Sequence, residues 1–256
     1  MIEKLARLGY ASKALVYAII GALAITAATT QGGQVTDTSG ALRVVLSQSY
    51  GRVLLLVLAV GLCGYAVWRV LDAFSDPDRH GTGLKGLVVR IGNVIRGSIY
   101  GALGLEAFHI FQGSSGSKGD ETEAWASLIM NFPLGDWLIG LVGAIVVAYG
   151  ASQVIKAFRG EDDPLVSWGA VPTAIRRVCH FGVGARGLII VTIGVFLVRA
   201  AIQHDPDEAA GTRESLVELV GVVEGRWLLA LMAAGLLAYA VDQAVHARYR
   251  RIRSVT

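Results

Sequence analysis

The sequence predicts an all-α integral membrane protein in which six transmembrane helices form three parallel two-helix repeats around a pseudo-threefold axis. Three observations predict this fold: the composition, six long apolar runs, and a repeated pattern of glycine, basic and tyrosine residues. Of the 256 residues, 54% are hydrophobic and 17% are charged, whereas soluble domains carry about 25% charged residues. This balance is typical of a polytopic membrane protein.

Six apolar runs supply the expected spans. Each approaches the ~20 residues that cross ~30 Å of hydrocarbon. The first run has the basic start of a signal peptide, but the same segment recurs twice inside the chain, so we expect it to remain as a span. The runs lie near residues 10–30, 53–73, 91–111, 137–157, 182–202 and 227–246.

The first helix of each expected pair carries the same pattern. The segments RLGYASKALVYAIIG, RIGNVIRGSIYGALG and HFGVGARGLIIVTIG begin at Arg7, Arg90 and His180. Steps of four place the repeated positions on one helix face. The equivalent residues are Gly9, Gly92 and Gly182; then Lys13, Arg96 and Arg186; then Gly21, Gly104 and Gly194.

The second helix of each pair repeats as well, and its equivalent residues are Gly51, Gly135 and Gly225; Tyr65, Tyr149 and Tyr239; and Arg69, Gln153 and Gln243. Two spans per unit make the copies parallel. We expect one membrane domain with repeats at 1–76, 77–163 and 164–256, the last ending in a basic cytoplasmic tail. Small residues predict close helix packing, which we expect to be weaker in the third copy, where Val191 replaces a small residue.

The connections between spans predict the surface features and the orientation. Amphipathic segments beginning at Ser39, Glu123 and Arg213 predict short helices on the outer surface. Of the 23 Lys and Arg residues, 17 lie at the two termini, in the second and fourth connections, or in the adjacent span ends. The positive-inside rule therefore predicts that both termini are cytoplasmic, and the run at 248–253 is expected among anionic headgroups.

Across nearly its whole length the chain resembles the bacterial membrane proteins grouped as domain of unknown function 1206. The resemblance is carried by ARLGYASKALVY at 6–17, by GRVLLLVLAVGLCGYAVWRVLDAF at 51–74, and by weaker second and third copies. It implies the three-repeat fold, the multi-pass topology and a bacterial inner (plasma) membrane location, but no activity. The third copy departs most, because Ile190 replaces the tyrosine of the first helix.

A cationic ring is the first candidate site. It consists of Lys13, Arg96 and Arg186, each about one turn inside the cytoplasmic end of its span, and Arg69 reaches a similar depth. One interpretation is an anion site for a lipid phosphate or a small anionic substrate. The other is snorkelling, in which long basic side chains hold helix ends at the interface.

Glu106 and His109 form the second candidate site, an i, i+3 pair within the third span. Arg199 lies at nearly the same depth on an equivalent helix, so a Glu106–Arg199 ion pair would explain both charges. The alternative is a proton-relay or cation-binding role. We expect no metal site, because di-iron bundles need the Glu-x-x-His spacing twice together with further carboxylates.

The sequence lacks the motifs of the common enzyme classes, and this limits the functions that we expect. Nothing resembles a Walker loop, a nucleophile elbow, a CxxC pair or an HExxH helix, so we expect no catalytic residues, no cofactor and no enzyme activity. The net charge of +3 does not imply a nucleic-acid partner. The expected partners are the lipid bilayer, anionic lipid headgroups and a larger membrane protein complex. The leading hypothesis is a scaffold or accessory subunit; the alternatives are a small transporter or channel, and an anionic-lipid-binding protein.

Overall fold

The computed structural model of the chain describes residues 2–29, 38–75, 83–113, 121–130, 132, 134–205 and 225–252. Their secondary structure is helical apart from one isolated antiparallel bridge between Val166 and Arg250. Within these described ranges, three short helices accompany six long ones. The elements are α1 (Ile2–Thr29), α2 (Thr38–Leu46), α3 (Gly51–Ser75), α4 (Leu84–Phe111), α5 (Glu121–Met130), α6 (Gly135–Arg159), the 3-10 helix η1 (Trp168–Ala170), α7 (Thr173–Gln203) and α9 (Gly225–Tyr249).

Five of the six long helices are long and apolar enough to cross a membrane, namely α1, α3, α6, α7 and α9. The exception is α4, whose Asn93, Arg96 and Glu106 side chains lower its hydropathy. The predicted all-α class and the membrane-spanning type of helix are therefore confirmed. A count of six spans stays a prediction.

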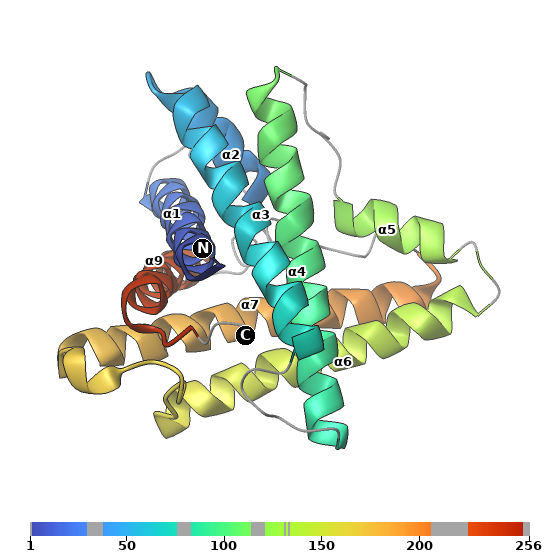
Figure 1. The fold of residues 1–256 in the computed structure, drawn as a ribbon. Helices are drawn as coiled ribbons and strands as arrows, with labels where there is room; N and C mark the ends of the chain where they lie inside the picture. Colours follow the sequence, from blue (N-terminus) through green and yellow to red (C-terminus); the bar gives the residue numbers. More distant parts are fainter. Residues whose placement is uncertain are drawn as a thin grey trace.

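The long helices pack as three pairs, α1 with α9, α3 with α4, and α6 with α7 (Figure 1). Each pair joins the second helix of one repeat to the first helix of the next, and the third repeat closes back onto the first. In Figure 1, α3 and α4 run up the view, α6 and α7 run across it, and α1 and α9 are seen nearly end on. The pairs therefore extend in three different directions from a common centre.

The three seams between repeats are built from the same repeat positions. A Cβ added to Gly21, Gly104 or Gly194 would lie within 2.9 Å of Leu237, Cys63 or Val147 respectively, and these neighbours are themselves equivalent. Backbones approach this closely only where no side chain separates them. The prediction of a weaker third seam is wrong, because α6 supplies its own glycines, Gly143 and Gly150, against α7.

The seams within repeats differ from one another. In repeats 1 and 3, α1 packs on α3 and α7 packs on α9, and a Cβ on Gly9 or Gly182 would overlap Tyr65 or Tyr239. In repeat 2, the equivalent Gly92 has no described atom within 4 Å of such a Cβ. Over the described residues, α4 and α6 do not pack closely. The ring of six helices is thus open between α4 and α6.

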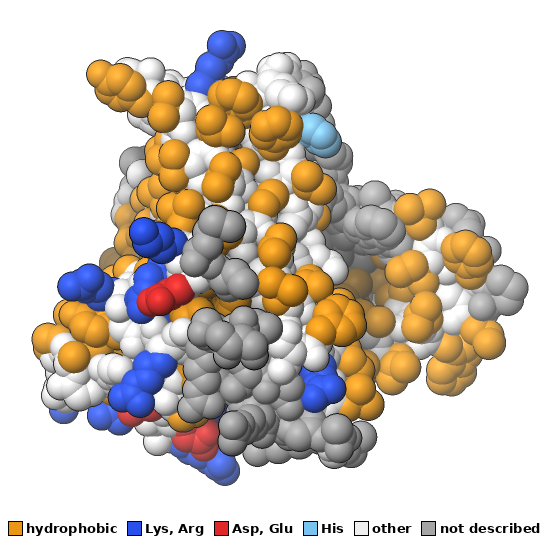
Figure 2. Space-filling view, viewed as in Figure 1, with side chains coloured by type: hydrophobic (Ala, Val, Ile, Leu, Met, Phe, Trp, Pro, Cys, Tyr) orange, Lys and Arg blue, Asp and Glu red, His pale blue; other side chains and the backbone are white. Residues whose placement is uncertain are grey.

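The short helices lie where the sequence predicts two of them. Helix α2 packs on α1, α3 and α4 and buries Ala41, Leu42 and Val45, and α5 packs on α6. The segment beginning at Arg213 lies outside the described residues. Figure 2 shows hydrophobic side chains over the upper part of the α3–α4 pair, whereas charged side chains gather at the lower left of the view. The surface is therefore segregated in the manner of a membrane protein.

Candidate functional site

A cavity of about 610 Å³ lies at the centre of the molecule, where the three helix pairs meet. All six long helices contribute to its wall, and residues 161–165 and Trp168, between α6 and α7, line it as well. The cationic ring of Lys13, Arg96 and Arg186 lines this cavity, and so does Arg69. The four predicted basic residues, which come from all three repeats, are thus brought together at one site.

The repeat explains why each cation meets a tyrosine. The first helix of every repeat carries the cation and the second helix carries the tyrosine at a fixed position, so packing of three copies produces three similar contacts. Lys13 Nζ donates to Tyr65 Oη at 3.4 Å, Arg96 Nη2 donates to Tyr149 Oη at 3.2 Å, and the Arg186 guanidinium lies 4.8 Å from the centre of the Tyr239 ring.

Two more tyrosines, Tyr17 and Tyr100, connect these contacts around the cavity. Their hydroxyl oxygens lie 3.3 Å apart. Arg186 Nε donates to Tyr17 Oη at 3.4 Å, and Lys13 Nζ lies 4.5 Å from the centre of the Tyr100 ring. Phenol groups and ring faces therefore surround the cations.

The electrostatics of the ring are unbalanced. Among the described residues, no carboxylate forms an ion pair with Lys13, Arg96 or Arg186. Their polar partners are the tyrosines and the amide oxygen of Asn93, which accepts from Arg96 Nη1 at 3.4 Å. Because burying a charge without a counter-charge is costly, the ring favours occupation by an anion. Its position on the cavity wall also favours the anion interpretation over snorkelling.

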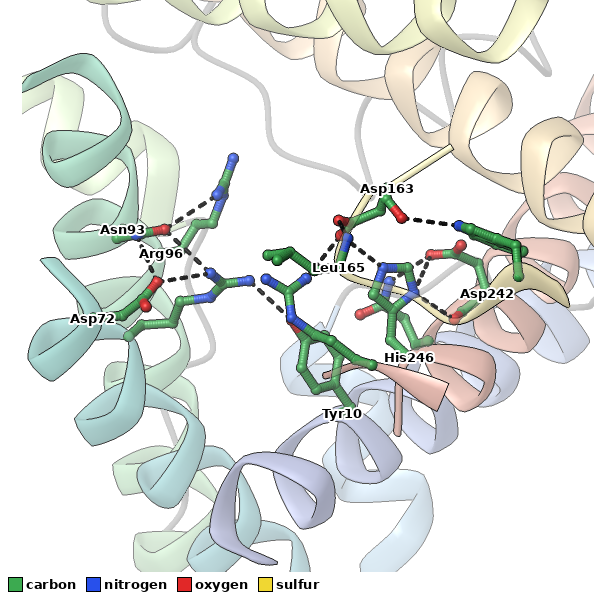
Figure 3. A network of polar contacts seen from close by, with 12 residues as sticks. Tyr10, Asp72, Asn93, Arg96, Asp163, Leu165, Asp242 and His246 are labelled. Carbon is green, nitrogen blue, oxygen red and sulfur yellow. Dashed lines mark hydrogen bonds and ion pairs between the residues drawn. The ribbon is translucent and has the colours of Figure 1, made fainter. Parts of the chain in front are cut away.

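Arg69 has a different environment from the ring. Its guanidinium lies 3.5 Å from the Asp72 carboxylate and donates to Tyr65, Tyr10 and Asn93 at 2.9, 3.0 and 3.2 Å. Asp72 in turn accepts a hydrogen bond from Asn93 at 2.8 Å. Figure 3 shows this network beside Arg96. The charge of Arg69 is therefore already balanced within the protein.

At the end of the cavity, Asp163 joins the segment between α6 and α7 to the end of α9 (Figure 3). It accepts hydrogen bonds from Arg250 at 2.8 Å and from the Leu165 backbone at 2.9 Å, and His246 Nε2 lies 3.3 Å away. Burial opposes ionisation of Asp163, but the His246 contact and the Arg250 charge outweigh it. The pKa of this carboxyl therefore lies well below its ordinary value.

Backbone hydrogen bonds hold the same segment in place. Ser167 donates to the Tyr249 carbonyl at 3.0 Å, and Arg251 donates to the Leu165 carbonyl at 2.7 Å. Two of the neighbouring carboxylates also have partners, since Asp162 pairs with Arg176 and Glu161 lies 3.6 Å from Arg159. The segment is thus fixed across this end of the cavity by backbone and side-chain contacts together.

The second predicted site lies apart from the cavity. Glu106 accepts a hydrogen bond from Ser39 of α2 at 2.7 Å and is not among the residues that line the cavity. His109 is exposed, and the Arg199 guanidinium lies 5.8 Å from the centre of the Phe196 ring. Glu106 therefore ties α2 to α4, while the Glu106–Arg199 pair stays a prediction.

Four further cavity residues, Tyr10, Asn93, Lys156 and His246, lie outside the predicted sites. The repeat pattern predicts the positions of all four residues. Tyr10 and Asn93 are equivalent and precede the cation by one helical turn, and Lys156 and His246 are equivalent and follow the Gln153/Gln243 position by one turn. Extending each polar face by one turn recovers all four.

Comparison with known proteins accounts for the repeat. The family described as Domain of Unknown Function (DUF1206) matches residues 8–76, 91–160 and 181–250. A Bacillus subtilis (strain 168) protein described as "Uncharacterized protein YxxB" is 33% identical over 242 residues, which cover 93% of this chain and 87% of that protein. No solved structure matches the chain significantly. Each match holds one cation-bearing helix and one tyrosine-bearing helix, and the chain therefore belongs to the DUF1206 family as three copies of its unit.

Proposed function

We propose that this protein is a non-enzymatic, multi-pass membrane protein that binds an anionic group in the cavity between its three repeats. One observation carries the proposal. Lys13, Arg96 and Arg186 line a single cavity, and none of them forms an ion pair with a carboxylate among the described residues. An anion in the cavity would supply the missing counter-charge.

The geometry suits an oxyanion such as a phosphate or a phosphate ester. The planar fork of Arg96 or Arg186 matches two phosphate oxygens, and the Lys13 ammonium acts as a point charge. The Tyr149 and Tyr17 hydroxyls already lie within hydrogen-bond distance of these guanidinium groups and can donate to the same anion. Because the surroundings are buried, each of these interactions is stronger than it would be in water.

We also propose how the chain is arranged in the membrane: a pseudo-threefold bundle of six spans with cytoplasmic termini. Equivalent glycines at the three inter-repeat seams support a pseudo-threefold axis, with repeat boundaries at 1–76, 77–163 and 164–256. The Arg96 and Glu106 contacts inside the protein support α4 as a sixth span, because intramembrane charges need internal partners. The basic residues at one end support cytoplasmic termini in the bacterial plasma membrane.

The scaffold or accessory role and the transport role both stay predictions. An accessory subunit can bind a lipid, so a stable partner complex recovered with the protein would add to the anion site rather than replace it. A transport path would need the cationic ring in line with Glu106. The position of Glu106, outside the cavity lining and bonded to Ser39, favours binding over passage.

Thermal unfolding of the full chain in a neutral detergent tests the anion site. The probes are inorganic phosphate and dihexanoyl phosphatidic acid, with dihexanoyl phosphatidylcholine as the neutral comparison. We expect the two anions to raise the Tm, because a ligand at about 100 times its Kd stabilises the folded state by about 2.7 kcal/mol.

The variants Arg96→Gln and Arg186→Gln should abolish this rise. The matched control is Arg159→Gln, because Arg159 is exposed and lies 3.6 Å from Glu161. If phosphate leaves the Tm unchanged, or raises it equally in all three variants, the proposed anion site is wrong.

A further inference from the structure

The gap between α4 and α6 has a cause in the sequence. In repeat 1, Gly61 packs directly on Ser12, and in repeat 3, Gly235 packs on Ala185. The equivalent residues in repeat 2 are Ile95 on α4 and Ile145 on α6, and both are exposed. Two branched side chains thus replace a small pair, and they prevent the close approach that the other repeats achieve.

The walls of the gap are apolar. Ile99 is 59% exposed, whereas the equivalent Val16 and Ile189 are 2% and 5% exposed in the closed repeats. Val142 is likewise exposed, while its counterparts Leu58 and Met232 are buried. Positions that form core elsewhere therefore face the gap in repeat 2. We call this gap the α4–α6 opening; it is bordered by Gly92, Ile95 and Ile99 on α4 and by Val142 and Ile145 on α6.

The α4–α6 opening leads to the cationic ring. Arg96, from α4, and Tyr149, from α6, both line the cavity, and their 3.2 Å hydrogen bond crosses between the two helices. Lys156 of α6 adds another cation to the same wall. Figure 3 shows the Arg96 side chain beside Asn93, whose amide oxygen accepts a hydrogen bond from it. An apolar entrance is thus followed directly by basic groups.

One end of the cavity is crossed by a segment that is held in place. Residues 161–168 cross that end, and their Glu161, Asp162 and Asp163 carboxylates line the cavity there. Hydrogen bonds to Tyr249 and from Arg251 fix the segment against the end of α9. These carboxylates are paired with Arg159, Arg176 and Arg250, so the barrier at this end is the fixed chain itself. A soluble anion would meet this barrier, whereas a ligand arriving through the α4–α6 opening would not.

We infer that the occupant of the cavity is an anionic phospholipid that enters sideways from the bilayer through the α4–α6 opening. Its phosphate lies against the cationic ring, and its acyl chains lie against Ile99, Val142 and Ile145. Basic groups behind branched aliphatic walls match the two chemical halves of such a lipid. This inference rests on the proposed anion site and adds the ligand class and its route.

Native mass spectrometry of the full chain, released from nanodiscs of phosphatidylglycerol and phosphatidylcholine, tests the inference. The Ile145→Trp variant blocks the α4–α6 opening, and the double variant Ile95→Ser with Ile145→Gly gives repeat 2 the small pair of repeat 1. Val53→Trp is the control, because Val53 is exposed on α3 away from the opening. We expect retained phosphatidylglycerol to fall about tenfold in both opening variants and to be unchanged in the control.

The possible outcomes test lateral entry through the α4–α6 opening separately from anion binding at the cationic ring. If phosphatidylglycerol is retained equally in wild type and in both opening variants, lateral entry is wrong, even where phosphate still raises the Tm. If phosphatidylcholine is retained as well as phosphatidylglycerol, the anionic class is wrong. If Arg96→Gln and Arg186→Gln retain phosphatidylglycerol fully and phosphate has no effect on the Tm, the anion site itself is wrong.

Discussion

Repeats 1 and 3 close their two helices around a shared glycine, whereas repeat 2 keeps the same glycine and leaves its helices apart. Gly9 and Gly182 lie where the backbones meet, but Gly92 borders the α4–α6 opening. The difference arises one turn further along, where Ile95 and Ile145 replace small residues. A glycine on one helix is therefore not enough for close packing, because both helices must present small side chains along the seam.

The comparison also separates two kinds of seam. The three seams between repeats use equivalent glycines against equivalent neighbours and hold the molecule together. The seams within repeats are closed in repeats 1 and 3 and open in repeat 2. Variation within one repeat can thus create an entrance without disturbing the seams that join the repeats.

The largest expected effect is on the free energy of unfolding, which alanine substitutions at two equivalent glycines should change in opposite directions. Gly182→Ala should destabilise the protein by about 1–3 kcal/mol, because the added methyl overlaps the backbone at Tyr239. Gly92→Ala should instead stabilise it by up to about 1 kcal/mol, because alanine favours the helix and meets no described atom there. Denaturant unfolding in detergent measures both. Equal destabilisation by the two variants would mean that the α4–α6 seam is closed.

Two glycines on α4 differ in how closely they approach α3 at the seam between repeats 1 and 2. Gly104→Ala should cost about 1–2 kcal/mol, because its Cβ would lie 2.7 Å from Cys63 Sγ. Gly101→Ala, one turn away on the same helix, should be close to neutral, since its Cβ would lie at an ordinary 3.4 Å from Ala66. The same unfolding assay applies. If both variants lose the same stability, the α3–α4 backbones are not as close as described.

The segment that crosses the cavity gives a smaller, pH-dependent effect. Because the pKa of Asp163 is lowered in the folded protein, its carboxylate stabilises the fold fully above the ordinary value of 3.8. This stabilisation is lost as the pH falls through the folded pKa. Asp163→Asn should therefore cost about 1 kcal/mol at neutral pH, and the difference from wild type should shrink below pH 3.8. Tm values measured against pH check this; a difference that grows with acidity would contradict it.

The smallest expected effect concerns Glu106. Glu106→Gln should change the Kd for inorganic phosphate by less than about twofold, because Glu106 bonds to Ser39 and does not line the cavity. Phosphate titrations followed by the Tm supply the measurement. A large loss of phosphate binding would mean that Glu106 contributes to the anion site, and it would favour the transport hypothesis.

The all-α class, the repeats and the shared depth of the basic residues were predictable because they rest on periodicity, whereas periodicity does not tell whether those residues face a cavity or the membrane interface. Steps of four place Gly9, Lys13 and Tyr17 on one face, and the same spacing recurs in each copy. The α4–α6 opening was not predicted, because the glycine pattern looks intact in repeat 2 and the change lies in Ile95 and Ile145 together. Contacts such as Asp163 with Arg250 join residues 87 positions apart, and no local pattern encodes them.

Photocrosslinking can show whether an anionic lipid reaches the cationic ring, using phosphatidylglycerol with a diazirine on its headgroup in nanodiscs that contain the wild-type chain. If the lipid headgroup reaches the cationic ring through the α4–α6 opening, mass spectrometry will find label on the cavity residues Arg96, Tyr149 and Arg186. Label confined to exposed basic residues such as Arg159, with none in the cavity, would contradict both the anionic-lipid ligand and its lateral route.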